Sequence, residues 1–353
     1  MRRHGLAGLA LILGAGAGCG GGPVGPVSPP APAGSARLPG IVSTEQLAAW
    51  QRERSVSLID VRTDVFTYLK DHLPGAVFLH TETLRASRGG IPTQLLDGPA
   101  YARLFGRIGV ALDRPVVIYS AGETHNMDAT FVAWLLAGLG HPQVYVLDGG
   151  YYKWLLEHRP VVRQYPRLAE TRLPDGPFRP EQASLADVQA AMRDGETVLV
   201  DARPPDQYAG EAGAQMRRGH IPGAISHYWQ DDLEREGFGF VWKSPERLRR
   251  DYAAQGITPD KPIIAYCNSA TEASHVHFTL RYLLGYPRVR VYVGSWTEWA
   301  EREELPVERG MRGRPGRRPD PGPPPPARGG DLPFTASRSR PGAVPAATPA
   351  RPA

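Results

Sequence analysis

Cys267 is the residue of this 353-residue chain best suited to nucleophilic chemistry. It follows the apolar run 263–266 (IIAY), and the short polar loop 268–272 (NSATE) separates it from a segment of helical spacing. In an open parallel sheet, ligands bind beyond the carboxyl ends of the strands, so we expect the thiol at a binding edge. The N–H groups of a loop that curls back into a helix, and the positive end of the helix dipole, can converge on the sulfur.

Such surroundings favour the thiolate form of Cys267. The pKa of a free thiol is about 8.5, and a helix N-terminus or a nearby cation can lower it to between about 3.5 and 7.5. A thiolate would attack a sulfane sulfur, become a persulfide and release the outer sulfur to an acceptor thiolate or cyanide. This chemistry needs no metal and no organic cofactor, and we expect neither. The alternative role for a cysteine at a strand end is that of a small buried apolar residue.

The two halves of the chain repeat the same motifs in the same order, at an offset of about 145 residues. The matched segments are 58–62 with 199–203 (LIDVR, LVDAR), 71–76 with 219–224 (DHLPGA, GHIPGA), 116–119 with 263–266 (VVIY, IIAY), and 144–149 with 289–294 (VYVLDG, VRVYVG). Ser120 stands in the first half where Cys267 stands in the second. Because an alkoxide is far less accessible than a thiolate, we expect a non-catalytic first half that packs against the second and covers the mouth of its site.

Each half alternates apolar runs with segments of helical spacing. In the second half the pattern predicts strands at 197–200, 263–266 and 288–291, and helices at 184–193, 245–254 and 273–284. Continuous apolar strands with helical crossovers indicate an α/β fold, a buried parallel sheet with helices on both faces. We predict two domains of this kind, at 40–160 (non-catalytic) and 181–308 (catalytic), joined by a Pro- and Arg-rich linker at 161–180.

The two ends of the chain differ from its centre in composition. Residues 1–18 have the layout of a secretory signal peptide, with Arg2 and Arg3 before an apolar run and small residues before Cys19. The GAGC sequence at 16–19 resembles a lipoprotein processing site, so Cys19 is a candidate for lipidation, with ordinary cleavage nearby or an inert cysteine as the alternatives. We therefore expect export to the periplasm or cell envelope, with a lipid anchor in the membrane. Residues 19–39 are predicted to be a flexible Gly/Pro-rich linker, and the Pro/Arg/Gly-rich tail 309–353 is predicted to be disordered.

Charge and cysteine content exclude some classes of protein. Much of the net charge of +5 lies in the tail, which favours a solvated segment over a nucleic-acid partner. There are two cysteines, and the first lies in the leader, so no disulfide can form within either domain. An unpaired thiol in an exported protein therefore indicates a function for Cys267.

The second half resembles the rhodanese domain. The resemblance lies in the DAR motif at 201–203, the loop at 219–224, the cysteine after a strand, and the closing GSWTEW motif at 294–299. The first half resembles the non-catalytic partner domain of tandem rhodaneses, and the likeness covers about residues 40–308. It implies a sulfurtransferase whose small-molecule partners are a sulfane-sulfur donor and a thiol or cyanide acceptor. Its candidate substrate-binding residues are Asn268, Ser269, Ala270, Thr271, Glu272, Ala273, Arg203 and Arg218.

The loop departs from the family at several positions. Ser269 and Gln207 stand where thiosulfate-using members carry cations, Glu272 stands where many bacterial relatives have arginine, and Ala270 replaces a glycine. A carboxylate ~5 Å from a dianionic donor costs on the order of a kcal/mol per charge and also opposes thiolate formation. Thiosulfate is the default donor, and 3-mercaptopyruvate and low-molecular-weight persulfides are the alternatives. Arg218 and its neighbour Arg217 are candidates for restoring positive charge.

Several other residues have both a structural and a functional interpretation. His72 and His220 are expected to stabilise Pro-Gly turns, and a catalytic role is the alternative for His220. His275 is expected to pack on its helix or lie on the helix surface, and orientation of the site is the alternative. For Arg203, a buried pair with Asp201 competes evenly with substrate contact. Trp296 and Trp299 are expected in the core or the pocket wall.

The sequence leaves two alternative functions to consider. Dual-specificity phosphatases share this fold but need an arginine at position 273, where this chain has alanine. The alternative from a different class is a rhodanese-like module that binds a persulfide, senses oxidation or acts as a scaffold without turnover.

Overall fold

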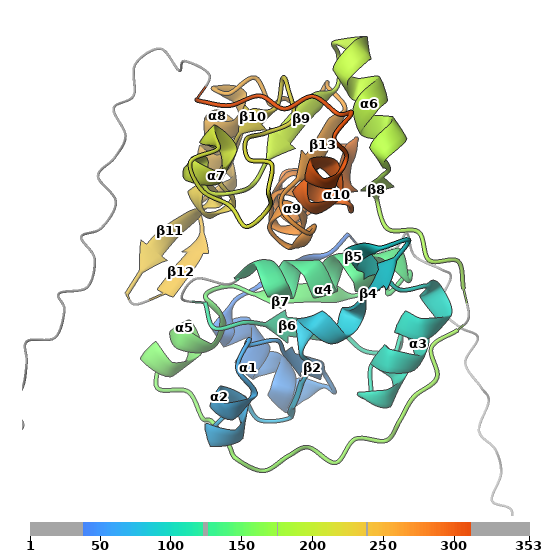
Figure 1. The fold of residues 1–353 in the computed structure, drawn as a ribbon. Coiled ribbons are helices and arrows are strands. Elements are labelled where there is room, and N and C mark those ends of the chain that lie inside the picture. Colours follow the sequence, from blue (N-terminus) through green and yellow to red (C-terminus); the bar gives the residue numbers. More distant parts are fainter. Residues whose placement is uncertain (1–37, 123–125, 175, 238, 312–353) are drawn as a thin grey trace, which may run out of the picture. The chain divides into compact units, whose positions relative to one another are not determined.

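Two five-stranded parallel sheets form the centres of the two halves in a computed structural model of the chain (Figure 1). The structure describes residues 38–122, 126–174, 176–237 and 239–311, and all of them belong to one compact unit. The predicted signal peptide, Cys19, residues 19–37 of the predicted linker and residues 312–353 of the predicted tail lie outside the described residues. None of the described helices is long and apolar enough to cross a membrane.

The first sheet has the strand order β1-β7-β6-β2-β3. Its strands are β1 (Gly40–Val42), β2 (Ser57–Asp60), β3 (Ala76–Phe78), β6 (Val116–Tyr119) and β7 (Val144–Leu147). The helices of this half are α1 (Thr44–Glu53), α2 (Val65–Lys70), η1 (Thr81–Leu84), α3 (Gly98–Arg107), α4 (Asn126–Gly138) and α5 (Gly150–Leu156). A hairpin of β4 (Arg85–Arg88) and β5 (Ile91–Leu95) follows η1.

The second sheet repeats this topology with the order β10-β9-β13-β14-β8. Its strands are β8 (Gln182–Ala183), β9 (Val198–Asp201), β10 (Ile225–Ser226), β13 (Ile263–Tyr266) and β14 (Val289–Tyr292). The helices are α6 (Leu185–Asp194), α7 (Pro205–Ala209), η2 (Trp229–Asp232), α8 (Pro245–Ala253), α9 (Thr271–His277), η3 (Phe278–Leu283) and α10 (Ser295–Glu301), and the hairpin is β11 (Leu233–Glu236) with β12 (Gly239–Trp242). The predicted α/β fold and its duplication are confirmed.

Strand β13 lies at the centre of its sheet because its four residues are all apolar and all buried. It pairs in parallel with β9 on one side and β14 on the other. The carboxyl ends of these strands therefore bring Asp201, Cys267 and the turn at 293–295 to the same edge. This is the edge at which an open parallel sheet binds its ligands.

Helix α4 is apolar around its whole circumference and nearly all of its residues are buried. Such a helix needs partners on every side. It packs against β6 and β7 of its own half and against α9 of the other half. One apolar core runs through both halves and includes Phe131 and Trp134 of α4 with Val276 of α9.

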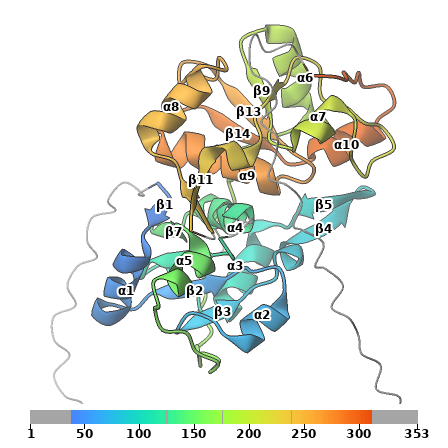
Figure 2. The ribbon, with the colours of Figure 1, turned by 90° about the vertical axis from the view of Figure 1, so that its left-hand side faces the viewer.

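Each hairpin extends from its own half towards the opposite half (Figure 2). Each also makes hydrogen bonds to that opposite half. The backbone N–H of Phe240 in β12 donates to the carbonyl of Gly122 in the first half, at 2.8 Å. Arg85 in β4 donates to the carbonyl of Ser269 in the second half, at 2.5 Å. Each half thus contacts the other half through the equivalent hairpin.

The duplicated histidines hold their turns, as expected. Nδ1 of His72 lies 2.9 Å from the backbone carbonyl of Tyr68, and its ring stacks on the ring of Tyr68. Nδ1 of His220 likewise lies 2.9 Å from the carbonyl of Tyr208, and its ring stacks on the ring of Tyr208. Both are buried and neither lies in the loop that follows β13. Their repetition in the half that has Ser120 in place of Cys267 fits a structural role.

Candidate active site around Cys267

Cys267 lies directly after β13, with its side chain 1% exposed. The chain then turns through 268–270 and enters α9 at Thr271. Ala270 makes this turn possible by adopting a left-handed conformation, with φ of 73°. A glycine adopts this conformation without steric cost, whereas an alanine adopts it with strain.

The hydroxyl of Ser295 holds the loop together from the next strand end. Its Oγ accepts hydrogen bonds from the backbone N–H groups of Cys267 and Ala270, each at 3.2 Å, and donates to the carbonyl of Tyr292 at 2.8 Å. Ser295 itself has a left-handed φ of 51°. The closing motif contains this serine, but its spacing alone did not indicate that the side chain binds the cysteine loop.

Backbone N–H groups converge on the sulfur, as the sequence predicted. The N–H of Ser269 points at Cys267 Sγ from 3.4 Å, and the N–H of Ala273, in the first turn of α9, also donates to the sulfur. Both groups favour the thiolate over the thiol.

The prediction that these surroundings lower the thiol pKa is wrong. Burial raises the pKa of Cys267 to about 12, and the negative charge of Glu272 adds to that rise. The N–H groups of Ala273 and Ser269 and the charge of Arg85 act in the opposite direction but do not outweigh burial. The expectation that Glu272 opposes thiolate formation is confirmed.

Glu272 is the acidic residue whose charge acts on the thiol of Cys267. Burial, together with the charge of Asp201, raises the pKa of its carboxyl to about 7, although a hydrogen bond with Cys267 works against that rise. This carboxyl therefore changes its charge close to neutral pH.

Arg85 is the site residue that sequence reasoning missed. It comes from β4 of the first half, and its guanidinium donates to the carbonyl of Ser269 and to Oγ1 of Thr271. It lies more than 180 residues before the loop in the chain, so no local motif could have linked it to Cys267.

The predicted arginines have other partners. Arg203 is 1% exposed, forms a bidentate pair with Asp201, and donates to the carbonyl of Gly219. Arg218 has an exposed side chain, and no hydrogen bond or ion pair among the described residues joins that side chain to the cysteine loop. The loop does make one contact towards α7, from Asn268 Nδ2 to Gln207 Oε1 at 2.9 Å. The structure thus brings residues 267–273 together and shows the structural pair at Arg203.

His275, Trp296 and Trp299 are buried, in agreement with their expected packing roles. The ring of His275 stacks on Trp242 with centroids 5.0 Å apart. Its Nδ1 lies 3.6 Å from Asp232, a fully buried carboxylate that also contacts His227 and Tyr252. This network supports α9 from behind the loop.

The equivalent place in the first half has different chemistry. Ser120 is buried and its Oγ lies 3.4 Å from Oδ1 of Asn126. Gly150 stands where the second half has Ser295, since Tyr151 N–H donates to Ser120 O in the same way that Trp296 N–H donates to Cys267 O. This half therefore lacks both the thiol and the hydroxyl that shapes the thiol's loop.

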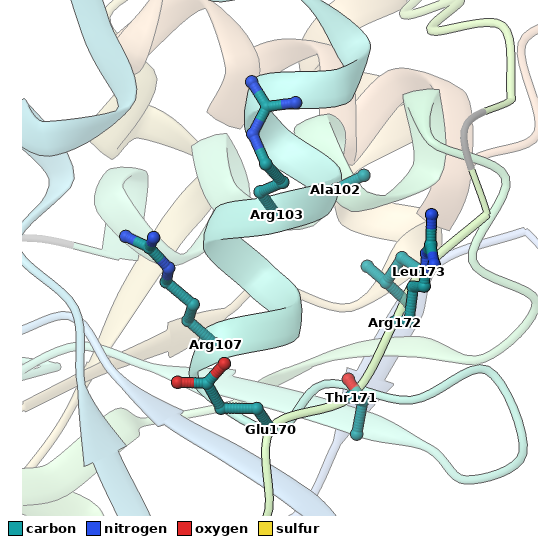
Figure 3. A pocket seen from close by; sticks show the side chains of 7 residues that line it. All are labelled: Ala102, Arg103, Arg107, Glu170, Thr171, Arg172 and Leu173. Carbon is teal, nitrogen blue, oxygen red and sulfur yellow. The ribbon is translucent and has the colours of Figure 1, made fainter.

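Two hollows elsewhere do not contain the thiol. One, of about 270 Å³, lies between α3 and residues 170–173 and is lined by Arg103, Arg107 and Arg172 (Figure 3). A larger one, of about 1040 Å³, is lined by the β5 end, α6 and the turn at Gly294. Among the described residues, no cluster of three or more His, Cys, Asp or Glu is arranged to hold a metal ion.

Comparison with known proteins agrees with this geometry. The rhodanese-like domain family matches the chain twice, at residues 43–157 and 184–302. A Synechococcus elongatus protein named as a candidate thiosulfate sulfurtransferase is 37% identical over 271 residues, 74% of this chain and 83% of its own. The thiosulfate sulfurtransferase of Corynebacterium glutamicum is 33% identical over 282 residues, 76% of this chain and 90% of its own.

A solved structure supports the same assignment. The crystal structure of SseA from Escherichia coli, described as a 3-mercaptopyruvate sulfotransferase with a rhodanese fold, superposes with a TM-score of 0.65. It is 30% identical, over 72% of this chain and 98% of SseA. This chain therefore belongs to the rhodanese family, as a sulfurtransferase built from two rhodanese-like domains.

Proposed function

We propose that Cys267 carries the sulfur in this sulfurtransferase. The observation that carries the proposal is the placement of its thiol at the carboxyl end of β13, with two backbone N–H groups aimed at the sulfur. The first half keeps the strand and replaces the thiol by Ser120. One persulfide per chain is expected.

The reaction has two displacements. The Cys267 thiolate attacks the outer sulfur of the donor, a sulfur–sulfur bond forms, and the donor leaves with the electron pair, as sulfite when the donor is thiosulfate. A thiol or cyanide then attacks the outer sulfur of the persulfide, and Cys267 leaves as a thiolate. The N–H groups of Ser269 and Ala273 stabilise the anionic sulfur in both steps.

Thiosulfate is the proposed default donor, with 3-mercaptopyruvate and small persulfides as alternatives. Asn268, Ser269, Ala270, Thr271, Glu272 and Ala273 form the cradle in which the donor's outer sulfur is received. When the carboxyl of Glu272 is charged, it disfavours the binding of a dianion in this cradle.

The test is a mass measurement on Cys267 after incubation with each donor, followed by an acceptor assay with cyanide and with a small thiol. Wild-type protein is expected to gain the mass of one sulfur atom and to turn over, and Cys267→Ser is expected to do neither. Activity retained in Cys267→Ser would remove Cys267 from this role.

A second candidate function is favoured by the burial of the thiol. A cysteine 1% exposed with a pKa raised to about 12 suits a module that stores a persulfide or responds to oxidation without fast turnover. Sulfur loading without multiple turnovers in any donor and acceptor combination would support this candidate over the enzyme.

We also propose export with a lipid anchor at Cys19. The support is the signal-like pattern of residues 1–18 and the small residues before the cysteine. In a bacterial host fed a labelled fatty acid, the full chain is expected to take up label, and Cys19→Ser is expected to remain unlabelled. Label in both proteins, or in neither, would contradict lipidation at Cys19.

A further inference from the structure

Arg85 is buried at the boundary between the two halves. Its side chain is 4% exposed, and its guanidinium carbon lies 4.2 Å from the ring centre of Phe131. Two of its nitrogens donate hydrogen bonds to the cysteine loop, one to the carbonyl of Ser269 and one to Oγ1 of Thr271. These two acceptors flank Ala270, the strained residue at which the loop turns into α9. The contacts therefore fix the loop on both sides of its turn.

The duplication shows that the hairpin itself does not require an arginine here. Arg85 follows η1 and pairs with Leu95, while Leu233 follows η2 and pairs with Trp242 in the same way. The second-half hairpin, with its leucine, contacts the loop that contains no thiol. The first-half hairpin, with its arginine, contacts the loop that contains Cys267. The cation is thus present only where the opposite half carries the nucleophile.

A buried cation is costly unless negative charge or hydrogen bonds compensate it. The nearest carboxylate oxygen in the part of the chain that the structure describes, of Glu82, is 4.0 Å away and belongs to a side chain that is 67% exposed. The buried Nε of Arg85 has no hydrogen-bond partner among the described residues. An anionic sulfur on Cys267 would supply the negative charge that this arginine otherwise meets only in part.

We propose that Arg85 is a positioning residue, supplied by the non-catalytic half, which holds the loop in its closed shape and stabilises the anionic sulfur of Cys267. This rests on the proposed role of Cys267 as the sulfur carrier. The first half is then part of the active site and does more than cover it. The arginine acts through its hydrogen bonds to the loop, at Ser269 O and Thr271 Oγ1, and through its charge, without a bond to the donor.

The test compares Arg85→Leu, which installs the residue of the second-half hairpin, with Arg85→Lys in the full-length protein. Arg88→Leu is the matched control, because Arg88 is an exposed arginine on the same strand. The readouts are the pH profile of Cys267 alkylation by iodoacetamide and the rate of sulfur loading from thiosulfate. Circular dichroism checks that each variant is folded.

Arg85→Leu is expected to slow alkylation about tenfold at each pH between about 7 and 9, which is the effect of a one-unit rise in the thiol pKa, and to slow loading at neutral pH about tenfold. Arg85→Lys is expected to restore part of both, because the charge returns without the two-pronged contact. Arg88→Leu is expected to match wild type. If Arg85→Leu does not fold, Thr271→Val removes one of the two contacts and is expected to shift the same profile in the same direction by a smaller amount.

A wild-type pH profile and loading rate in folded Arg85→Leu would overturn the proposal, as would an equal loss in Arg88→Leu. When Arg85→Leu does not fold, an unchanged profile in Thr271→Val overturns it as well. Failure of the underlying function has a different signature, since Cys267 would then gain no sulfur even in the wild type.

Discussion

Ser295 Oγ accepts a hydrogen bond from the backbone nitrogen of Cys267 at 3.2 Å. The same oxygen accepts from Ala270, so one hydroxyl sets both ends of the turn that surrounds the thiol. Gly150 takes this place in the half that has no thiol. The half with the thiol and the half without it thus differ in the residue that shapes the loop as well as in the residue at the strand end.

Ser295→Ala is expected to lower the free energy of unfolding by about 1–3 kcal/mol, because two buried N–H groups lose their acceptor. Sulfur loading should slow as well, since the loop loses its shape. Urea unfolding and the mass assay measure the two effects, with Ser87→Ala on an exposed hairpin position as the control. Wild-type loading in Ser295→Ala would show that the loop does not depend on this hydroxyl.

Glu272→Gln is expected to change the reactivity of Cys267 above pH 7 and to leave it nearly unchanged below. The pKa of Glu272 is about 7, so above that pH its charge raises the thiol pKa, and below it the neutral carboxyl resembles glutamine. Iodoacetamide alkylation should therefore be faster in Glu272→Gln than in wild type at pH 8, and the two rates should converge towards pH 6. A constant ratio of rates across this range would contradict the assignment.

Glu272→Arg is expected to raise thiosulfate turnover more than 3-mercaptopyruvate turnover. The change replaces a charge that repels a dianion with one that attracts it, and 3-mercaptopyruvate carries the smaller charge. A donor panel with the wild type and this variant measures the ratio of the two kcat/KM values. An unaltered ratio would mean that the carboxyl does not set donor preference.

The His227–Asp232 pair is expected to stabilise the second half most strongly between about pH 4 and pH 6.5. Burial disfavours both charges, but hydrogen bonds and charge attraction within the network raise the pKa of His227 and hold that of Asp232 below its usual range. The histidine's contribution is present below its unfolded pKa and is lost as the pH rises through its raised folded pKa. The carboxylate's contribution is present above its unfolded pKa and is lost as the pH falls through its lowered folded pKa.

Asp232→Asn tests this pair. It should lower the free energy of unfolding by about 3–5 kcal/mol near pH 5, because it leaves a buried histidine without its counter-charge. The loss should be smaller at pH 8, because the contribution of His227 falls as the pH rises above its unfolded pKa and through its raised folded pKa. Urea unfolding at the two pH values, with exposed Glu246→Gln as the control, gives the comparison. An equal loss at both pH values would exclude a charged pair.

Ala270→Gly is expected to leave the free energy of unfolding unchanged or raise it by up to about 1 kcal/mol. Glycine removes the cost of the left-handed φ of 73° but adds entropy to the unfolded chain. Ala273→Gly, three residues later inside α9, should instead lower stability by about 1 kcal/mol. Destabilisation of similar size in both variants would show that Ala270 is not strained.

The sequence determined the two-domain α/β fold and the place of Cys267. Ordered repeats with continuous apolar strands at 116–119 and 263–266 allow only a duplicated parallel sheet, and a sheet of this kind exposes the carboxyl end of its central strand. The sequence also showed that the loop departs from the family pattern at Glu272, because the residue type alone gives the charge at that position.

Only the tertiary structure decided the electrostatics of the thiol. Loop amides and a helix N-terminus are local features that favour a thiolate, but burial by the rest of the fold outweighs them and raises the pKa of Cys267 to about 12. The compensating cation, Arg85, comes from the other half of the chain. Local spacing cannot report burial, and it cannot report a contact between hairpin and loop that arises only when both halves share one core.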